Sequence, residues 1–124
     1  MSEQSEALKE RTMLFAVNTL RLVDRFPRTV GADVIARQLA KSATSVAANY
    51  RSACTARSRR DFIAKLVIVV EEADESVGWL DLIARSRIVA ATDLPALRDE
   101  ANQLRALFSN PLELLAPTVA SSEK

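Results

Sequence analysis

The chain has 124 residues, of which 48% are hydrophobic and 27% charged, so a single domain with one core is expected. Its 17 basic and 16 acidic side chains leave a net charge of +1, which gives no overall nucleic-acid signal. The absence of histidine excludes the catalytic couples and metal sites that need an imidazole. A single cysteine, Cys54, excludes an internal disulfide and predicts a cytosolic protein.

Glycine and proline are scarce, with two and four copies, well below average usage of about 7% and 5%. A β-rich fold with several tight turns is therefore excluded. The residues between Pro27 and Pro95 include no proline and are rich in Ala, Leu, Arg and Glu, which favour helices. The longest strongly apolar stretch, residues 62–70, is too short to span a membrane. The sequence predicts an all-α protein without a membrane partner.

The first predicted helix spans residues 5–26, where apolar and small polar side chains recur at spacings of three and four. Its inward positions are Leu8, Thr12, Phe15, Thr19, Leu22, Val23 and Phe26. Pro27 disfavours helical geometry in the preceding residue, and Gly31 tolerates the left-handed conformation of a reversal. Residues 27–31 are therefore predicted to be a connection.

The second predicted helix spans residues 32–56 and has two polar residues on its inward line. This line contains Ile35, Leu39, Ser42, Val46, Asn49 and Ala53. Together with residues on an adjoining line, its polar members form a candidate structural seam of Gln38, Ser42, Ser45 and Asn49. Such side chains can bond to backbone carbonyls or to one another, and a buried Asn can fix register or oligomeric state. A polar pocket or pore lining is the alternative interpretation.

A continuous helix over residues 32–86 would be about 80 Å long, which is too long for one small domain. Ser58 with Asp61 three residues later is a variant capping box, and predicts a third helix over residues 59–86. Its inward positions are Phe62, Leu66, Val69, Val70, Ala73, Val77, Leu80 and Ile83.

A fourth helix is predicted over residues 93–110, capped by Thr92 or Asp93, with Pro95 in its first turn. Its inward positions are Leu97, Ala101, Leu104 and Phe108. Residues 111–124 are predicted to be a frayed tail. Short connections between long amphipathic helices imply an antiparallel up-down-up-down four-helix bundle, formed as one domain over residues 1–124.

Charge is unevenly distributed around the predicted turn between the second and third helices. The candidate anion- or partner-binding residues are Arg51, Arg57, Arg59, Arg60 and Lys65. Arg59 and Arg60 oppose the helix dipole in the first turn of their helix. They are interpreted either as a site for RNA phosphate or an acidic protein, or as partners of acids on a neighbouring subunit, or as solvated side chains. Pairing between subunits would suit a ring with head-to-tail contacts.

Four acids follow this basic segment and are candidate interface residues: Glu71, Glu72, Asp74 and Glu75. Helical di-metal sites of the usual kind need Glu-x-x-His pairs, and the chain has no histidine. No metal, cofactor or catalytic residue is therefore assigned.

One stretch carries a family resemblance. It runs over residues 36–50, with Ala53, Arg57, Ser58, Asp61, Phe62, Lys65 and the acidic segment 72–79. From about Leu8 to Phe108 the chain resembles the bacterial four-helix-bundle proteins encoded in intervening sequences of 23S ribosomal RNA genes. The resemblance implies a cytosolic homopentamer with no established enzymatic activity. A related branch, the accessory proteins of diversity-generating retroelements, is strongly basic and binds nucleic acid and a reverse transcriptase; the balanced charge here departs from it.

Residues and resemblance together predict a non-enzymatic, cytosolic helical bundle that self-assembles, most simply into a homopentamer, and acts as an interaction or scaffold protein. The alternative is an accessory protein that binds RNA or another nucleic acid through the basic turn, repeated around a ring.

Overall fold

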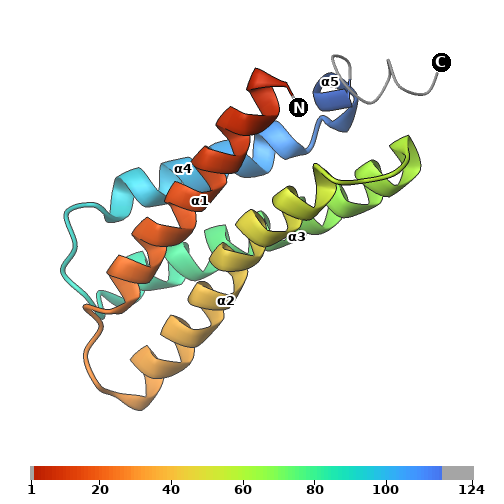
Figure 1. Ribbon diagram of the computed structural model, residues 1–124. Coiled ribbons are helices and arrows are strands. Elements are labelled where there is room, and N and C mark those ends of the chain that lie inside the picture. The colour runs from red at the N-terminus through yellow and green to blue at the C-terminus, as the bar shows by residue number, and fades with distance from the viewer. Residues whose placement is uncertain (1, 116–124) are drawn as a thin grey trace.

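The structure, a computed structural model, describes residues 2–115, and every regular element in that part is a helix (Figure 1). The helices are α1 (Glu3–Val23), α2 (Val30–Ala53), α3 (Arg59–Ser86), α4 (Leu94–Phe108) and α5 (Pro111–Leu115). Within residues 2–115, no helix is long and apolar enough to cross a membrane. The predicted all-α class is confirmed.

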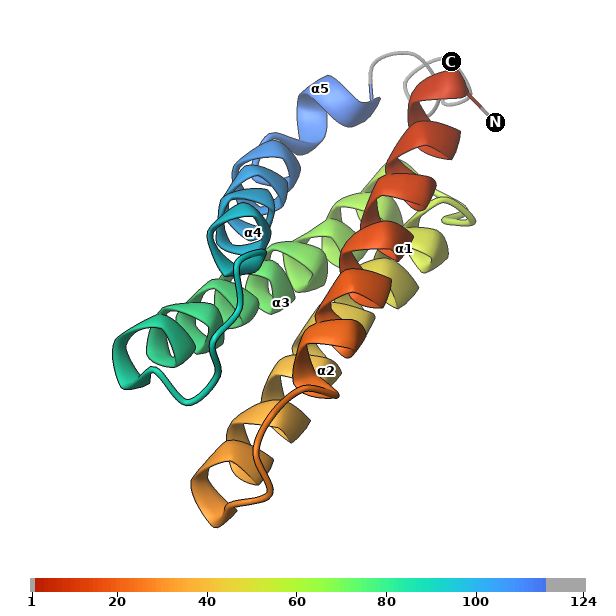
Figure 2. The same cartoon turned by 90° about the vertical axis from the view of Figure 1, so that its left-hand side faces the viewer.

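The four long helices pack as an up-down-up-down bundle. α2 packs against α1 and α3, and α3 packs against α2 and α4. Figures 1 and 2 both show α1 beside α2. Contact between α1 and α4 is the least extensive of the four neighbouring pairs, and α1 and α3 lie diagonally across the bundle. This arrangement is consistent with the predicted antiparallel four-helix bundle.

The start of α3 is confirmed, because the Ser58 hydroxyl accepts a hydrogen bond from the Asp61 amide at 3.0 Å. The start of α1 comes earlier than predicted, since Ser2 caps it by accepting from the Ser5 amide at 3.0 Å. This helix ends at Val23, three residues before the predicted end at residue 26. The sequence therefore predicted the Ser58 cap of α3 but not the Ser2 cap of α1.

Gly31 does not form the predicted reversal. The hydroxyl of Thr29 caps α2 and accepts from the Ala32 amide at 3.3 Å, so Gly31 lies in the first turn of the helix. No glycine in the described residues has a positive φ. The connection therefore covers residues 24–29 instead of the predicted 27–31, and α2 ends at Ala53 instead of residue 56.

The C-terminal region also differs from prediction. Asp93 precedes α4 but makes no capping hydrogen bond, because its carboxylate accepts from the Arg25 guanidinium at 2.7 Å. α4 ends at Phe108, and residues 111–115 form α5 instead of a frayed tail. Leu114 of α5 is buried against the core, which explains why this segment is helical. Residues 116–124 of the predicted tail lie outside the described part.

The core follows the predicted inward positions. Most of them are buried, and the rest are half-buried at its margin: Val23, Phe26, Ile35, Asn49, Val70 and Val77. Tyr50 lies off the predicted inward line of α2 but has the burial of a core anchor, with its ring centroid 5.0 Å from that of Phe108. This contact joins the end of α2 to the end of α4.

A buried hydroxyl pair crosses the centre of the α2–α3 interface. The Oγ atoms of Ser42 and Ser76 lie 2.8 Å apart, and Ser76 can donate onward to the Glu72 carbonyl at 2.9 Å. Both serines are at most 1% exposed. Ser42 belongs to the predicted seam, whereas Ser76 was not singled out. Each hydroxyl also has a carbonyl acceptor in its own helix, Leu39 for Ser42 at 3.2 Å and Glu72 for Ser76. The bond between the two serines is the one that depends on the register of α2 on α3.

We expect Ser42→Ala and Ser76→Ala each to reduce the free energy of unfolding by about 1 kcal/mol, since each removes the cross-helix bond. The double variant should lose clearly less than the sum, because the bond can be lost only once. Denaturant unfolding of the four proteins measures this coupling. Thr44→Ala is the control, because Thr44 bonds within its own helix, to the Ala40 carbonyl; it should add to Ser76→Ala. Additive losses for the serine pair would contradict the interpretation.

Candidate interaction surface

The predicted basic residues lie at one end of the bundle, where α2 ends and α3 begins (Figure 1). We call Arg51, Arg57, Arg59, Arg60 and Lys65 the basic turn. Its four arginines are exposed and its lysine is half-buried. The helix hairpin therefore brings all five residues, as predicted, to the same end of the fold.

The basic turn keeps most of its charge available. Lys65 reaches across from α3 and its Nζ donates to the Ser52 hydroxyl of α2 at 3.1 Å. Arg51, Arg57 and Arg60 form no ion pair with any residue in the range 2–115. An open hollow of about 450 Å³ beside the turn is lined by Ser58, Arg59, Arg60 and Ile63. This arrangement can bind an anionic group but contains no group placed to act on it chemically.

The four predicted interface acids divide into two environments. Asp74 is taken up within the chain, because its carboxylate accepts from Arg105 of α4 at 2.9 Å. Glu71 and Glu75 are exposed, while Glu72 is half-buried. Burial raises the pKa of the Glu72 carboxyl above its usual range, Glu75 and Glu71 act in the same direction, and Lys41 opposes them. Within the part of the chain that is described, no group of three His, Cys, Asp or Glu residues could hold a metal ion.

The candidate polar seam is not one continuous line. Ser42 is buried against Ser76, as described above. Asn49 is half-buried, and its Nδ2 donates to the Ser45 carbonyl and to the Ser45 hydroxyl, both at 2.9 Å. Gln38 is exposed on the outside of α2. The hydrogen bonds of Ser45 and Asn49 stay within the helix, as the structural interpretation expects.

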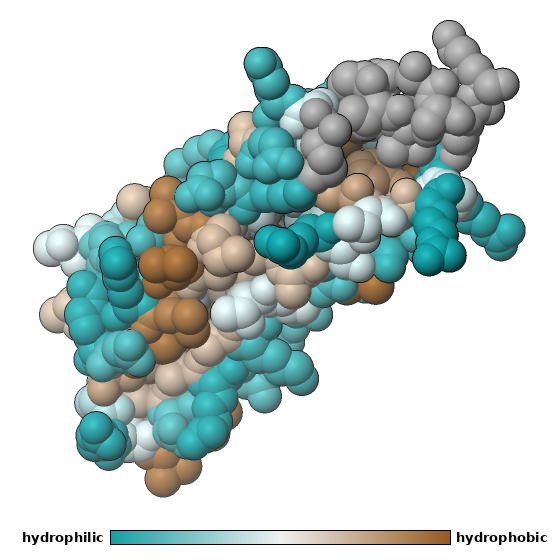
Figure 3. Space-filling view, viewed as in Figure 1, coloured by the Kyte–Doolittle hydropathy of each residue, from teal (hydrophilic) through white to brown (hydrophobic). Residues whose placement is uncertain are grey.

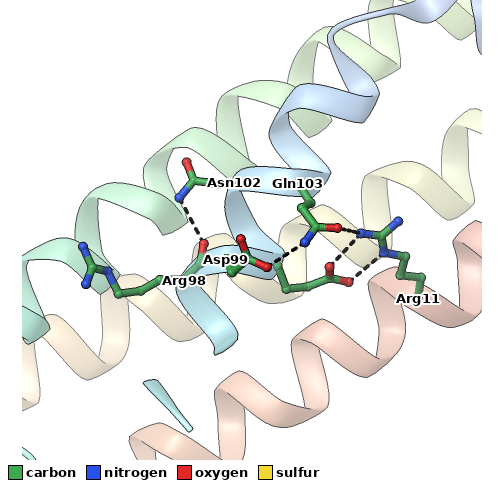
Figure 4. Close-up of polar contacts among 6 residues, drawn as sticks. Arg11, Arg98, Asp99, Asn102 and Gln103 are labelled. Atoms are coloured by element: carbon green, nitrogen blue, oxygen red, sulfur yellow. Dashed lines mark hydrogen bonds and ion pairs between the residues drawn. The ribbon is translucent and has the colours of Figure 1, made fainter. Parts of the chain in front are cut away.

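A polar network between α1 and α4 was not predicted. Arg11 donates to both carboxylate oxygens of Glu100, at 2.7 and 2.8 Å, and to Gln103 at 2.9 Å (Figure 4). Gln103 in turn donates to Asp99 at 2.7 Å. The hydrogen bond to Glu100 holds the pKa of Arg11 above its ordinary value. Helix periodicity could not identify these partners, because it carries no information on which helices face each other.

Large apolar side chains are exposed on the outer faces of α1 and α3, and also near the start of α2 (Val30, Val34) and on α5 (Leu112). On α1 these are Met13, Leu14 and Leu20, and on α3 they are Val67, Ile68 and Leu82. Each of the six is between 41% and 53% exposed. In Figure 3, which looks onto α1, hydrophobic residues gather over this helix and beside it. These residues lie outside the predicted inward lines of their helices.

The fold and these surfaces define a helical-bundle protein with apolar outer faces on two diagonal helices and a basic turn at one end. The chain belongs to the family of 23S rRNA-intervening sequence proteins, whose sequence model matches residues 5–110. It is similar to a solved structure from Bacteroides thetaiotaomicron VPI-5482, described as a protein with unknown function from the S23 ribosomal protein family. The TM-score is 0.78 at 28% identity, over 88% of this chain and 97% of that one. The search of curated proteins found no match.

We expect Glu72→Gln to raise the free energy of unfolding at pH 7 by less than about 1 kcal/mol, because solvent screens the charge at this half-buried position. A raised pKa means that folding disfavours the ionised carboxylate, so the native chain gains stability as the pH falls from the raised value towards the ordinary 4.5. The advantage of the glutamine should therefore disappear near pH 4. Denaturant unfolding across this pH range measures the difference.

Glu75→Gln provides the mechanistic control, because Glu75 is the largest neighbouring charge that raises the pKa of Glu72. In that background, Glu72→Gln should bring a smaller gain at pH 7. A loss of stability in Glu72→Gln at pH 7 would show that attraction by Lys41 outweighs burial.

Proposed function

We propose that the chain is a non-enzymatic cytoplasmic interaction protein that assembles with copies of itself, as a homopentamer, and acts as a scaffold. The observation that carries this proposal is the exposure of apolar side chains on both α1 and α3. The core is already filled by the inward faces of these helices. Apolar patches left over on the outside of a complete bundle mark interaction surfaces.

The chemistry of the chain supports a binding role over a catalytic one. The sequence offers no histidine as a general base, and its only thiol, Cys54, is half-buried. Burial raises the pKa of the Cys54 thiol, which disfavours the reactive thiolate. The open hollow at the basic turn holds arginines and a serine whose hydroxyl is engaged in capping α3. Binding is the function that such a surface serves most directly.

Self-assembly is also supported by the location of the two apolar faces. α1 and α3 lie diagonally across the bundle, so their outer faces point away from each other. A copy with a contact surface on each of two sides can join two neighbours, and head-to-tail contacts of this kind generate rings when the rotation closes. The number five comes from the family resemblance alone.

Light scattering behind size exclusion should give a mass five times that of the 13.6 kDa chain. The mass should persist at high salt, because apolar contacts are not screened by ions. A monomer at micromolar concentration would overturn the proposal of self-assembly. A stable oligomer of another size would leave self-assembly in place and refute the pentamer.

Nucleic-acid binding is a second candidate function, favoured by Arg51, Arg57 and Arg60, which are exposed and form no ion pair with residues 2–115. A ring would repeat this turn once per copy, so a modest local charge would contact many phosphates. This role would parallel that of the accessory proteins of diversity-generating retroelements.

If the basic turn binds phosphates, the affinity for a structured RNA should fall steeply between 50 and 200 mM salt, by about a thousandfold or more for six phosphate contacts. Arg59→Glu with Arg60→Glu should weaken binding and flatten this dependence. Fluorescence anisotropy at several salt concentrations measures both effects.

The matched control is Arg37→Glu with Arg85→Glu, which makes the same change in net charge at exposed positions near the other end of the bundle. This variant should bind nearly as the native chain does. Equal weakening by both double variants would mean that only net charge matters, and no binding at low salt would remove the RNA role.

A further inference from the structure

We propose that copies assemble through a parallel contact between the outer face of α1 on one copy and the outer face of α3 on the next. This inference rests on the proposed self-assembly and specifies its interface. Two rows of residues form the contact. The α1 stripe is Glu10, Leu14, Val17 and Arg21, and the α3 stripe is Arg60, Ala64, Val67 and Glu71.

The two stripes have the same spacing and opposite charge. In each stripe the residues are four, three and four positions apart, so they lie along one helix face. The α1 stripe runs from acid through two apolar residues to base, and the α3 stripe runs from base through two apolar residues to acid. The charged ends are eleven residues apart in both, which is about 16 Å. Laid side by side in parallel, the stripes place Glu10 opposite Arg60 and Arg21 opposite Glu71.

The stripes are available for such a contact. Every member is exposed except Val17, which is half-buried. None of the four charged members forms an ion pair with residues 2–115. Complementary charges across an interface contribute to specificity and fix its register, so the two ion pairs that flank the apolar residues would set the register of this contact.

The topology of the bundle favours a parallel contact. In an up-down-up-down bundle, α1 and α3 run in the same direction, and here they lie diagonally across the fold. A rotation about an axis along the bundle keeps all directions, so it can bring α1 of one copy beside α3 of the next in parallel. Each copy then uses one stripe on each side. This is a head-to-tail contact, which gives a ring when the rotation between copies closes.

Other pairings of the stripes either leave one stripe uncovered or do not close. Two α1 stripes could pair antiparallel across a two-fold axis, and so could two α3 stripes, but each choice leaves the other stripe uncovered. Parallel pairing of the basic end of α3 with the acidic end of a second α3 needs an offset of about 16 Å per copy, which generates a filament. Only the contact between α1 and α3 covers both apolar faces with one kind of interface.

Charge reversal tests the register. Arg21→Glu and Glu71→Arg should each weaken association by about tenfold or more, because each places like charges opposite one another. The double variant restores an opposite pair and should recover most of the association. Arg51→Glu is the matched control, at an exposed arginine outside both stripes. Sedimentation over a concentration series measures association, and circular dichroism verifies that each variant folds.

Cysteine cross-linking tests which helices meet. In a Cys54→Ala background, Leu14→Cys with Ala64→Cys on the same chain should give a ladder of oxidised species, because each copy links to two neighbours. A chain carrying either new cysteine alone should give none. Dimers from Leu14→Cys alone or from Ala64→Cys alone would instead reveal a two-fold contact and overturn the proposal.

The outcomes separate this interface from self-assembly itself. A native chain that is monomeric overturns both. A native oligomer whose mass is unchanged by either charge reversal, and which gives no ladder, overturns the interface and leaves self-assembly standing.

Discussion

The packing of α2 on α3 is the constraint on which the rest of the structure depends. These are the two longest helices, and every other long helix packs against one of them. The turn between them contains neither glycine nor proline, so it is specified by the Ser58 cap and by the burial of the flanking apolar residues. The bond between Ser42 and Ser76 lies within the same interface. A shift of one helix along the other would break this bond, and it would also displace the basic turn.

The fold was largely predictable because it follows from a local pattern. A spacing of three and four identifies an inward line, and the inward lines pack on one another. The errors occurred where a distant residue decided the outcome. Asp93 is a residue type that favours N-caps, yet its carboxylate accepts a hydrogen bond from Arg25, which follows α1 and lies 68 residues earlier in the chain. Residues 111–115 begin with a proline and were expected to fray, but Leu114 is buried against the core. Gly31 was expected to reverse the chain, although the Thr29 hydroxyl starts the helix before it.

The candidate surfaces were predictable to a similar degree. Contiguous residues around one turn must lie at one end of a helix hairpin, so the basic turn was recovered intact. The acids were predicted as one group, but helical rotation places Asp74 towards α4 and leaves Glu71 outside. The apolar outer faces were not predicted, because helix periodicity identifies the inward face and gives no measure of how exposed the remaining apolar residues are. Identifying them required the exposure of each side chain in the folded bundle.

The two proposed roles meet at Arg60, which belongs to both the basic turn and the α3 stripe. An arginine that pairs with Glu10 of a neighbour is no longer free to neutralise a phosphate, so assembly would reduce the charge offered by each turn. Arg51 and Arg57 lie outside the stripe and keep their charge in the assembled form. Nucleic-acid binding by a ring would therefore depend on Arg51, Arg57 and Arg59, whereas assembly would depend on Arg60 and Arg21. In such a ring, Arg51 and Arg57 would be the arginines of the basic turn that neither the proposed interface nor an ion pair with residues 2–115 occupies.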